Sequence, residues 1–354
     1  MSTPTSSQTY QVVLNDQSGD QSSPTLLNNL VIKTVATPVP GPGEVLIRFH
    51  AAGLNYRDLS VLANSPVYPI ETISGVVPAC DGAGEIVSTG PDSKWSDSIG
   101  QDVILVVNGG WLDGDDLAQY TVETTLGAGS VDGSLTQYGV FKDQFIVKKP
   151  ANLSFEEAAA ISACASTAVH ALDAIEIKKG MTVLTQGTGG VSSFVIQFAS
   201  ALGAHVIATS SSDEKLSQAK SLGASDIINY KTTPNWAEEV LRITDGKGVD
   251  LVIDVGGAGT IEQSIAATKL GGTVALVGFL TPSTQTDLIA SIIFGGKTLK
   301  GIRGQSKKHL ERAVESIEKH NLHPIINTYE WADANVAFED LRKGVKAGKL
   351  IIKV

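Results

Sequence analysis

The residues best suited to binding chemistry form a glycine-rich turn. Residues 183–186 have an apolar strand pattern, and Gly187-Thr188-Gly189-Gly190-Val191-Ser192 leads directly into an apolar helix pattern. In such a turn, free backbone amides lie at the positive end of the helix dipole, where a pyrophosphate binds. Ser192 stands where the common glycine pattern has its third glycine, and it is small enough to keep the packing close. The turn predicts a dinucleotide site at Gly187, Gly189, Gly190, Val191 and Ser192; the alternative is a plain strand-to-helix turn.

The end of the next strand indicates which dinucleotide binds. An acid about 20 residues after the turn would hold the ribose hydroxyls of NAD. Here the strand at 205–209 ends in Ser210-Ser211-Ser212, and Lys215 follows. Small hydroxyls and a cation suit a 2′-phosphate, so Ser210, Ser211 and Lys215 favour NADPH. NADH stays possible because Asp213 and Glu214 are close, and the same serines would also cap the next helix.

Strand and helix patterns alternate around these residues. Expected strands lie at 181–186, 205–209, 226–229, 250–255 and 273–277, and expected helices at 191–202, 213–222, 235–244 and 260–269. This alternation predicts an α/β fold with a doubly wound parallel sheet and helices on both faces.

The first 150 residues have the pattern of a β-rich region instead of alternating strands and helices. Short strand patterns bounded by glycine, proline or aspartate lie at 44–50, 83–90, 102–107 and 135–147. Residues 108–133 are predicted to form a long surface loop and residues 1–8 a frayed tail. Ser154 and Glu157 form a capping box that opens a helix at 155–162. The strand pattern at 350–354 has no partner in the α/β region, so we expect it to return to the β-rich part.

Composition narrows the possible partners. The chain has 354 residues, which favours two domains, and a net charge of −10, which argues against nucleic acid. No apolar run approaches the roughly 20 residues of a membrane span. Two cysteines, Cys80 and Cys164, are too few for a disulfide scaffold or a four-cysteine zinc lobe, and we expect both to be small buried side chains. These features indicate a cytoplasmic protein without a membrane partner.

The chain resembles the medium-chain dehydrogenase/reductase superfamily over nearly its full length. It is most similar to the zinc-independent branch with quinone-reductase-like and alcohol-dehydrogenase-like members. The resemblance implies a GroES-like catalytic domain at 1–152, a Rossmann domain at 153–320 and a return to the catalytic domain at 321–354. It also implies a small-molecule substrate and a homodimer. The matching segments are Gly41-Pro42-Gly43-Glu44-Val45, Gly53-Leu54-Asn55-Tyr56-Arg57-Asp58, Asp81-Gly82-Ala83-Gly84, 153–159, 187–191 and Gly348-Lys349-Leu350.

The resemblance also indicates where a metal would bind. Zinc members of the superfamily hold the catalytic metal with Cys, with His and a neighbouring Glu, and with a second Cys or an acid. The matching positions here are Asn55, Cys80 (followed by Asp81) and Ala163. Because a catalytic zinc needs three protein ligands and an open position, we expect none. No cysteine lies at 108–138, where the structural zinc of the family would bind.

Without a Lewis acid, hydrogen-bond donors must stabilise the charge that develops on the substrate. This favours quinones, enones and enals, in which that charge is delocalised. Tyr56 is the first candidate donor, Asn55 has an amide to donate, and Arg57 has the charge to stabilise an anion. Asp58 is expected to hold Arg57 or the local backbone. The alternative role for Tyr56 is packing against the nicotinamide pocket.

Further cofactor contacts are implied by position in the family. Each lies after a strand or on a turn, where ligands bind such sheets. They are Thr167, Tyr230, Val255, Gly256, Gly278, Phe279 and Arg303.

Three functional hypotheses follow. The first is a zinc-independent, NADPH-dependent oxidoreductase that transfers hydride to an activated C=C bond or a quinone. The second is an alcohol or ketone dehydrogenase that works without zinc and uses Tyr56. The third is a non-catalytic NADPH-binding sensor or structural subunit.

Overall fold

The computed structural model describes all residues except 1–2, 115, 280, 282–286 and 345. They form two compact units: unit 1 comprises Met1–Ser166 and Gln305–Val354, and unit 2 comprises Thr167–Gly304. The boundaries expected from the sequence differ from this division, because residues 153–166 and 305–320 belong to unit 1. Among the described helices, none has the length and apolar character needed to cross a membrane.

Unit 2 is built on a parallel sheet. Within the described residues its six strands follow the order β10-β9-β8-β11-β12-β13. The chain continues from β8 to β9 on one side, while β11 pairs with β8 on the other, so the winding direction reverses at β8. Ligands bind such sheets at the carboxyl ends of the strands at this reversal. The strands are β8 (Thr182–Gln186), β9 (His205–Ser210), β10 (Asp226–Asn229), β11 (Val249–Asp254), β12 (Thr268–Leu276) and β13 (Thr298–Gly301).

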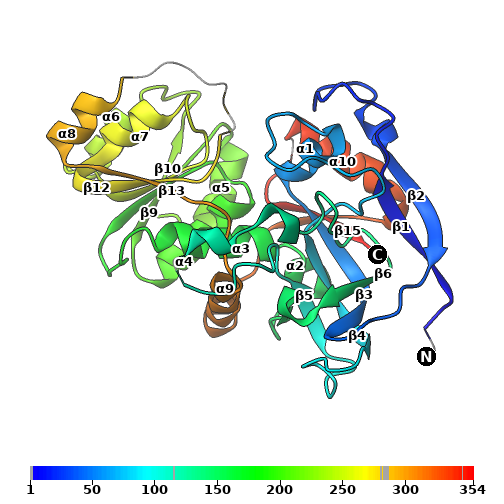
Figure 1. Ribbon diagram of the computed structural model, residues 1–354. Helices are drawn as coiled ribbons and strands as arrows, with labels where there is room; N and C mark the ends of the chain where they lie inside the picture. The colour runs from blue at the N-terminus through cyan, green and yellow to red at the C-terminus, as the bar shows by residue number, and fades with distance from the viewer. Residues whose placement is uncertain (1–2, 115, 280, 282–286, 345) are drawn as a thin grey trace. The chain divides into compact units, whose positions relative to one another are not determined.

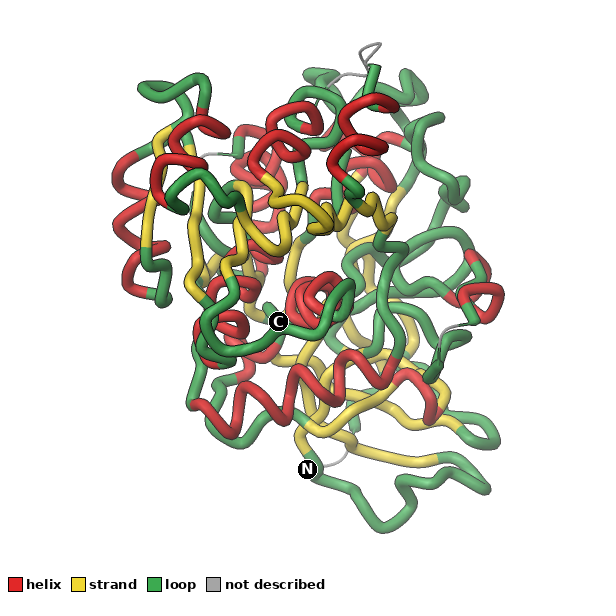
Figure 2. Tube along the Cα trace, turned by 90° about the vertical axis from the view of Figure 1, so that its left-hand side faces the viewer, coloured by secondary structure: helices red, strands yellow, loops and turns green. Residues whose placement is uncertain are grey.

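Helices cover both faces of this sheet (Figures 1 and 2). On one face, Val240 of α6 and Ile265 of α7 share a buried cluster with Leu184, Val252 and Val274 of the strands. Helix α4 covers the opposite face. The doubly wound fold predicted from the alternating patterns is thereby confirmed. The helices are α4 (Gly190–Ala201), α5 (Asp213–Ser221), α6 (Trp236–Ile243), α7 (Ile261–Ala267) and α8 (Ile289–Gly295).

Unit 1 contains a mostly antiparallel sheet in the order β14-β15-β3-β4-β5-β7, with β6 paired to β3. Strand β15 pairs antiparallel with β3, so that Leu350 lies opposite Leu54. This confirms the expected return of the C-terminal strand to the β-rich part. The strands are β3 (Glu44–Leu54), β4 (Asp81–Thr89), β5 (Asp102–Leu105), β6 (Tyr138–Lys142), β7 (Ile146–Lys148), β14 (Ile326–Tyr329) and β15 (Lys349–Lys353).

The remaining helices connect and cover these strands. Ser154 and Glu157 form the predicted capping box at the start of α2, which is shorter than the expected helix and is followed by a separate helix, α3. The α-helices are α1 (Tyr56–Ala63), α2 (Phe155–Ala158), α3 (Ser162–Leu172), α9 (Lys307–His320) and α10 (Ala334–Lys343). The 3-10 helices are η1 (Leu26–Asn29), η2 (Leu117–Gln119), η3 (Val122–Thr124), η4 (Asp143–Phe145) and η5 (Trp331–Asp333).

The N-terminal segment differs from its prediction. Strand β1 (Ser6–Val12) pairs antiparallel with β2 (Leu30–Ala36), beginning with Ser6 opposite Ala36. The expected frayed tail at 1–8 is therefore wrong from Ser6 onward, because β2 supplies a hydrogen-bonded partner that local composition does not reveal. Residues 1–2 lie outside the described part.

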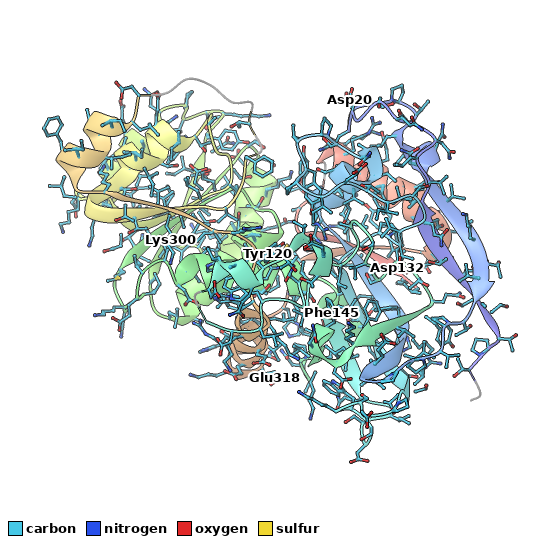
Figure 3. All side chains as sticks on the ribbon, in the orientation of Figure 1. Asp20, Tyr120, Asp132, Phe145, Lys300 and Glu318 are labelled. Carbon is cyan, nitrogen blue, oxygen red and sulfur yellow. The ribbon has the colours of Figure 1, made fainter. Side chains whose placement is uncertain are left out.

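The expected surface loop at 108–133 is also wrong in part, because Trp111 and Leu126 are buried. The Asn108 amide donates to the Thr121 carbonyl at 2.7 Å and to Thr125 Oγ1 at 2.9 Å, which ties the loop to itself. Phe145, labelled in Figure 3, packs against Gly109, where an added Cβ would lie 2.5 Å from its ring. Polar contacts thus compact a segment whose glycine and aspartate content suggests exposure.

Candidate functional site

The glycine turn of unit 2 has the geometry of a phosphate-binding loop. Gly187 adopts a left-handed φ of +73°, and Gly189 is the N-cap residue of α4 with no side chain to cap it. A Cβ added at Gly187 or Gly189 would meet no atom within 4 Å. The amides at the start of α4 therefore lie next to open space, as a dinucleotide pyrophosphate requires.

Ser192 fastens this turn to the sheet. Its hydroxyl donates to the Gln186 carbonyl at 2.6 Å, and Ser193 donates to the Thr188 carbonyl at 3.2 Å. The role expected for Ser192, close packing of helix against strand, matches this contact.

A hydrogen-bond network connects the carboxyl ends of the neighbouring strands. The side-chain carbonyl of Gln186 accepts from the amides of Val255 and Gly256, each at 3.2 Å, and its amide donates to Asp254 at 3.1 Å. A Cβ at Gly278 would collide with the Val255 carbonyl. The structure therefore brings Val255, Gly256 and Gly278 together at the carboxyl edge. Gln186 and Asp254 organise this edge, and sequence reasoning did not single them out, although both end apolar strands.

The tip of β9 lies beside the glycine turn, since the Gly187 amide donates to the Thr209 carbonyl at 2.7 Å. Ser210 is only 3% exposed, with its hydroxyl 3.5 Å from that of Thr188, whereas Ser211 and Lys215 are half-buried. The Tyr230 amide donates to the Ser210 carbonyl at 3.0 Å. Two of the predicted cofactor residues, Ser210 and Tyr230, therefore lie next to one another.

The other predicted cofactor residues occupy separate places in unit 2. Thr167 is in α3 and Arg303 follows β13, and these two segments are joined by a 2.8 Å contact between His170 Nδ1 and the Gly304 carbonyl oxygen. Phe279 follows Gly278 with most of its ring exposed.

In unit 1, the predicted catalytic residues begin helix α1. The Asp58 carboxylate accepts a hydrogen bond from the backbone N–H of Asn55 at 2.7 Å, which completes a capping box at the start of α1. Burial raises the pKa of Asp58 to about 6. Asp58 thus holds the local backbone, one of the two roles expected for it.

Arg57 is engaged within unit 1. Its Nε donates to the Tyr68 hydroxyl at 2.7 Å, and its Nη1 donates to the Leu126 carbonyl at 2.8 Å. The guanidinium also lies 5.6 Å from the centre of the Tyr68 ring. Tyr56, in contrast, is 53% exposed, so it does not pack into the core of unit 1.

A buried polar cluster lies beside the start of α1. The cluster consists of Asn55, Cys80, Asp81, Cys164 and Lys349. Lys349 is 4% exposed, and its ammonium group donates to the Leu54 carbonyl at 2.7 Å, to Asn55 Oδ1 at 2.8 Å and to Asp81 Oδ2 at 2.8 Å. The sequence places this lysine directly before the apolar run Leu350-Ile351-Ile352, which is the signal that could have identified it.

The other members of the cluster complete these contacts. The Asn55 amide donates to Asp81 Oδ2 at 3.1 Å and to Cys80 Sγ at 3.5 Å, so both of its hydrogens are engaged inside unit 1. Asp81 Oδ1 accepts from the backbone amide of Ala163 at 2.9 Å. Burial raises the pKa of Cys164 to about 11 and also raises the pKa of Cys80. Both cysteines are therefore buried thiols, as expected.

These residues do not fit a catalytic zinc. An ammonium group cannot be a metal ligand and repels a cation, and here it contacts Asn55, one of the implied ligand positions, and Asp81, the neighbour of another. Within the described ranges, no three His, Cys, Asp or Glu side chains are arranged to hold a metal ion. The oxygen atoms of Leu54, Asn55 and Asp81 instead form a binding site for the ammonium group of Lys349.

Two family descriptions match the chain. Residues 41–151 match "Alcohol dehydrogenase GroES-like domain" and residues 190–319 match "Zinc-binding dehydrogenase". The first match lies in unit 1, and most of the second lies in unit 2.

Individual relatives match over nearly the whole length. A zinc-type alcohol dehydrogenase-like protein of Schizosaccharomyces pombe is 38% identical over 88% of this chain and 91% of its own length. Another, from Leptosphaeria maculans, is 31% identical over 92% of this chain and 94% of its own. The solved structure of an NAD-dependent alcohol dehydrogenase is 32% identical, covers 98% of this chain and 99% of its own, and has a TM-score of 0.84.

Proposed function

The chain belongs to the medium-chain dehydrogenase/reductase superfamily, and we propose that it is a zinc-independent, NADPH-dependent reductase of enones, enals or quinones. Membership makes it an oxidoreductase that uses a nicotinamide cofactor. The observation that carries the finer proposal is the ammonium group of Lys349 within the cluster that occupies the implied zinc-ligand positions.

The proposed chemistry divides between cofactor and protein. A bound reduced nicotinamide supplies hydride. The open turn at Gly187 and Gly189 binds the pyrophosphate, and the edge formed by Val255, Gly256 and Gly278 supports the nicotinamide half. A conjugated substrate spreads the charge that hydride addition creates, so it needs a hydrogen-bond donor rather than a strong Lewis acid. The hydroxyl of Tyr56, an exposed residue, is that donor.

The preference for NADPH is supported by the tip of β9. Residues 209–212 contain no carboxylate, and the nearest acid, Asp213, accepts a hydrogen bond from Asn229 Nδ2 at 2.7 Å. Ser211 and Lys215 are then the residues for a 2′-phosphate. NADH is the other cofactor to compare, since a 32% identical relative is named as NAD-dependent.

The cofactor proposal is tested by Ser211→Asp, because Ser210 is too buried for an informative substitution. A carboxylate there repels a 2′-phosphate, so the ratio of kcat/KM for NADPH to that for NADH should fall at least about tenfold. Ser221→Asp, at the other end of α5, makes the same charge change as a control. An unaltered ratio in Ser211→Asp would remove the 2′-phosphate assignment.

The activity is tested by steady-state oxidation of NADPH with a panel of quinones, enones, enals and simple ketones. We expect turnover with the conjugated substrates. Turnover restricted to simple ketones would instead support an alcohol or ketone dehydrogenase, the second candidate, which the names of the relatives favour. Tight NADPH binding without turnover on any member would support a non-catalytic protein.

We further propose a homodimer formed through unit 2. Helix α8 exposes Ile289, Ile293 and Phe294, and β13 is an edge strand of the sheet. Lys300 of β13 is labelled at this edge in Figure 3. An apolar helix beside an unpaired strand edge favours association of two sheets. A cytoplasmic location is also proposed, since Cys80 and Cys164 are buried free thiols.

A further inference from the structure

The burial of a whole ammonium group in unit 1 calls for a role, because an isolated charge in a protein interior is unfavourable. Burial lowers the pKa of Lys349, but Asp81 and the neighbouring thiols raise it by more, so that it lies above its usual value. The group therefore stays charged at neutral pH. The contacting ionisable groups are the Asp81 carboxylate and, nearby, the thiols of Cys80 and Cys164.

Strand register brings the contacting atoms together from three neighbouring strands. Leu54 ends β3, Asp81 begins β4 and Lys349 begins β15. Residue 53 pairs with Asp81, and Leu54 pairs with Leu350. The three residues are thus held at one end of the sheet by backbone hydrogen bonds, without help from a flexible loop.

The backbone before Lys349 is fixed as well. Gly348 has a φ of +77°, and a Cβ there would collide with the Ile325 carbonyl, so the position requires glycine. The Lys349 amide donates to that same carbonyl at 2.9 Å. The side chain of Lys349 therefore enters the cluster from a rigid starting point.

All hydrogen-bond donors of the Lys349 ammonium group are used within the cluster. A tetrahedral nitrogen has one bond to Cε and three N–H groups, and all three N–H groups find acceptors at 2.7–2.8 Å: the Leu54 carbonyl, Asn55 and Asp81. No N–H is left to donate to a substrate, so Lys349 acts through the residues that it holds.

We propose that Lys349 is a positioning residue whose ammonium group takes the place of a metal ion in this ligand set, neutralising Asp81 and fixing the amide of Asn55. The inference rests on the zinc-independence in the proposed function and explains what replaces the metal. Asn55 directly precedes Tyr56, so Lys349, by holding the Asn55 side chain, fixes the start of α1 from which Tyr56 projects.

The first test measures thermal stability and needs no substrate. Lys349→Met leaves the buried Asp81 carboxylate without its counter-charge, and the Tm should fall by about 10 °C. Lys353→Met is the matched control on the same strand, because Lys353 pairs with the exposed Glu330, and its Tm should change by no more than about 3 °C. The double variant Asp81→Asn/Lys349→Met contains no unpaired buried charge and should recover most of the loss.

The second test separates charge from folding. In the refolded double variant, kcat should stay at least about tenfold below that of the unaltered protein, while the Kd for NADPH changes less than about twofold. A double variant with full kcat would overturn the proposal, since the ion pair that holds Asn55 would then be dispensable. If Lys349→Met fails to fold, the double variant and Lys353→Met still decide the question.

Metal content gives an independent measurement. Protein purified after growth with added zinc should contain far less than one zinc per chain, and its Tm should not respond to a chelator. One zinc per chain, with a Tm that falls on chelation, would overturn the proposal. Because Tm and zinc content do not depend on the substrate, a failure of the enone panel would contradict only the proposed function.

Discussion

Tyr56 is the proposed hydrogen-bond donor to the substrate. Its side chain is 53% exposed, whereas both amide hydrogens of Asn55 are engaged with Asp81 and Cys80. Tyr56→Phe removes only the hydroxyl, so kcat should fall about 10- to 100-fold while the Kd for NADPH stays within about twofold. Steady-state kinetics and fluorescence titration measure the two quantities.

Tyr138→Phe, which removes the same hydroxyl from strand β6, is the matched control for Tyr56→Phe and should leave kcat unchanged. If Tyr56→Phe also leaves kcat unchanged, Tyr56 has no part in proton donation and its role is to shape the surface.

Asp58 gives the stability of the protein a specific pH dependence. Burial raises its pKa to about 6 from 3.8, so the folded state binds a proton more tightly than the unfolded state between these values. The resulting stabilisation is complete below pH 3.8 and is lost as the pH rises through 6. The shift of about two pKa units corresponds to roughly 3 kcal/mol in the free energy of unfolding.

Asp58→Asn should remove this part of the pH dependence, because an amide does not titrate and still offers an acceptor to the Asn55 backbone. Urea unfolding at pH 4 and pH 7 measures the change in the free energy of unfolding for both proteins. The same decline in Asp58→Asn as in the unaltered protein would show that other groups cause it.

At the scale of elements, a substitution at the start of α4 tests cofactor binding without disturbing the fold. Gly189 has an ordinary φ and open space around its Cβ position, so a larger side chain fits the fold but occupies the space of the phosphates. Gly189→Val should leave the Tm within about 3 °C and weaken NADPH binding at least about tenfold. Calorimetry of unfolding and isothermal titration measure the two effects. Equal NADPH affinity in both proteins would place the pyrophosphate elsewhere.

The elements that sequence patterns predict best are those with local signals. The sequence pattern predicts strand β8 and helix α4 to within a residue, and it correctly assigns the terminal strand to the β-rich part. Strands β1 and β13 were missed because their stability comes from partners distant in the sequence: Ser6 pairs with Ala36, and Thr298 pairs with Thr273. In β1 only Tyr10 and Val12 are apolar, and β13 is only four residues long.

The residues of the candidate site also differ in how far the sequence predicts them. The open glycines were predictable because their spacing follows from one turn. The engagement of Asn55 was not, because its partners Asp81 and Lys349 are brought together only by the register of three strands. A residue type shows what a side chain is able to donate, while tertiary contacts decide where those donors are used.

At the scale of the whole molecule, the exposed face of α8 predicts the oligomeric state. Phe294 is 87% exposed, and Ile289 and Ile293 lie on the same helix. Phe294→Asp places a charge in the proposed interface, so the protein should become a monomer in light scattering after gel filtration. Val39→Asp, at an 85% exposed apolar residue of unit 1, is the matched control and should remain dimeric. Identical masses for both variants would exclude α8 from the interface.

The Lys349–Asp81 pair also sets an order of events during synthesis. The two residues are 268 positions apart, and all of unit 2 is translated between them. At roughly 5–20 residues per second, Asp81 leaves the ribosome tens of seconds before its counter-charge exists. Unit 2 has all of its residues by then and is free to fold. Unit 1 cannot close around Asp81 until residue 349 has been added, so the nascent chain passes through a stage in which the cofactor-binding half is complete and the half that carries Tyr56 is not.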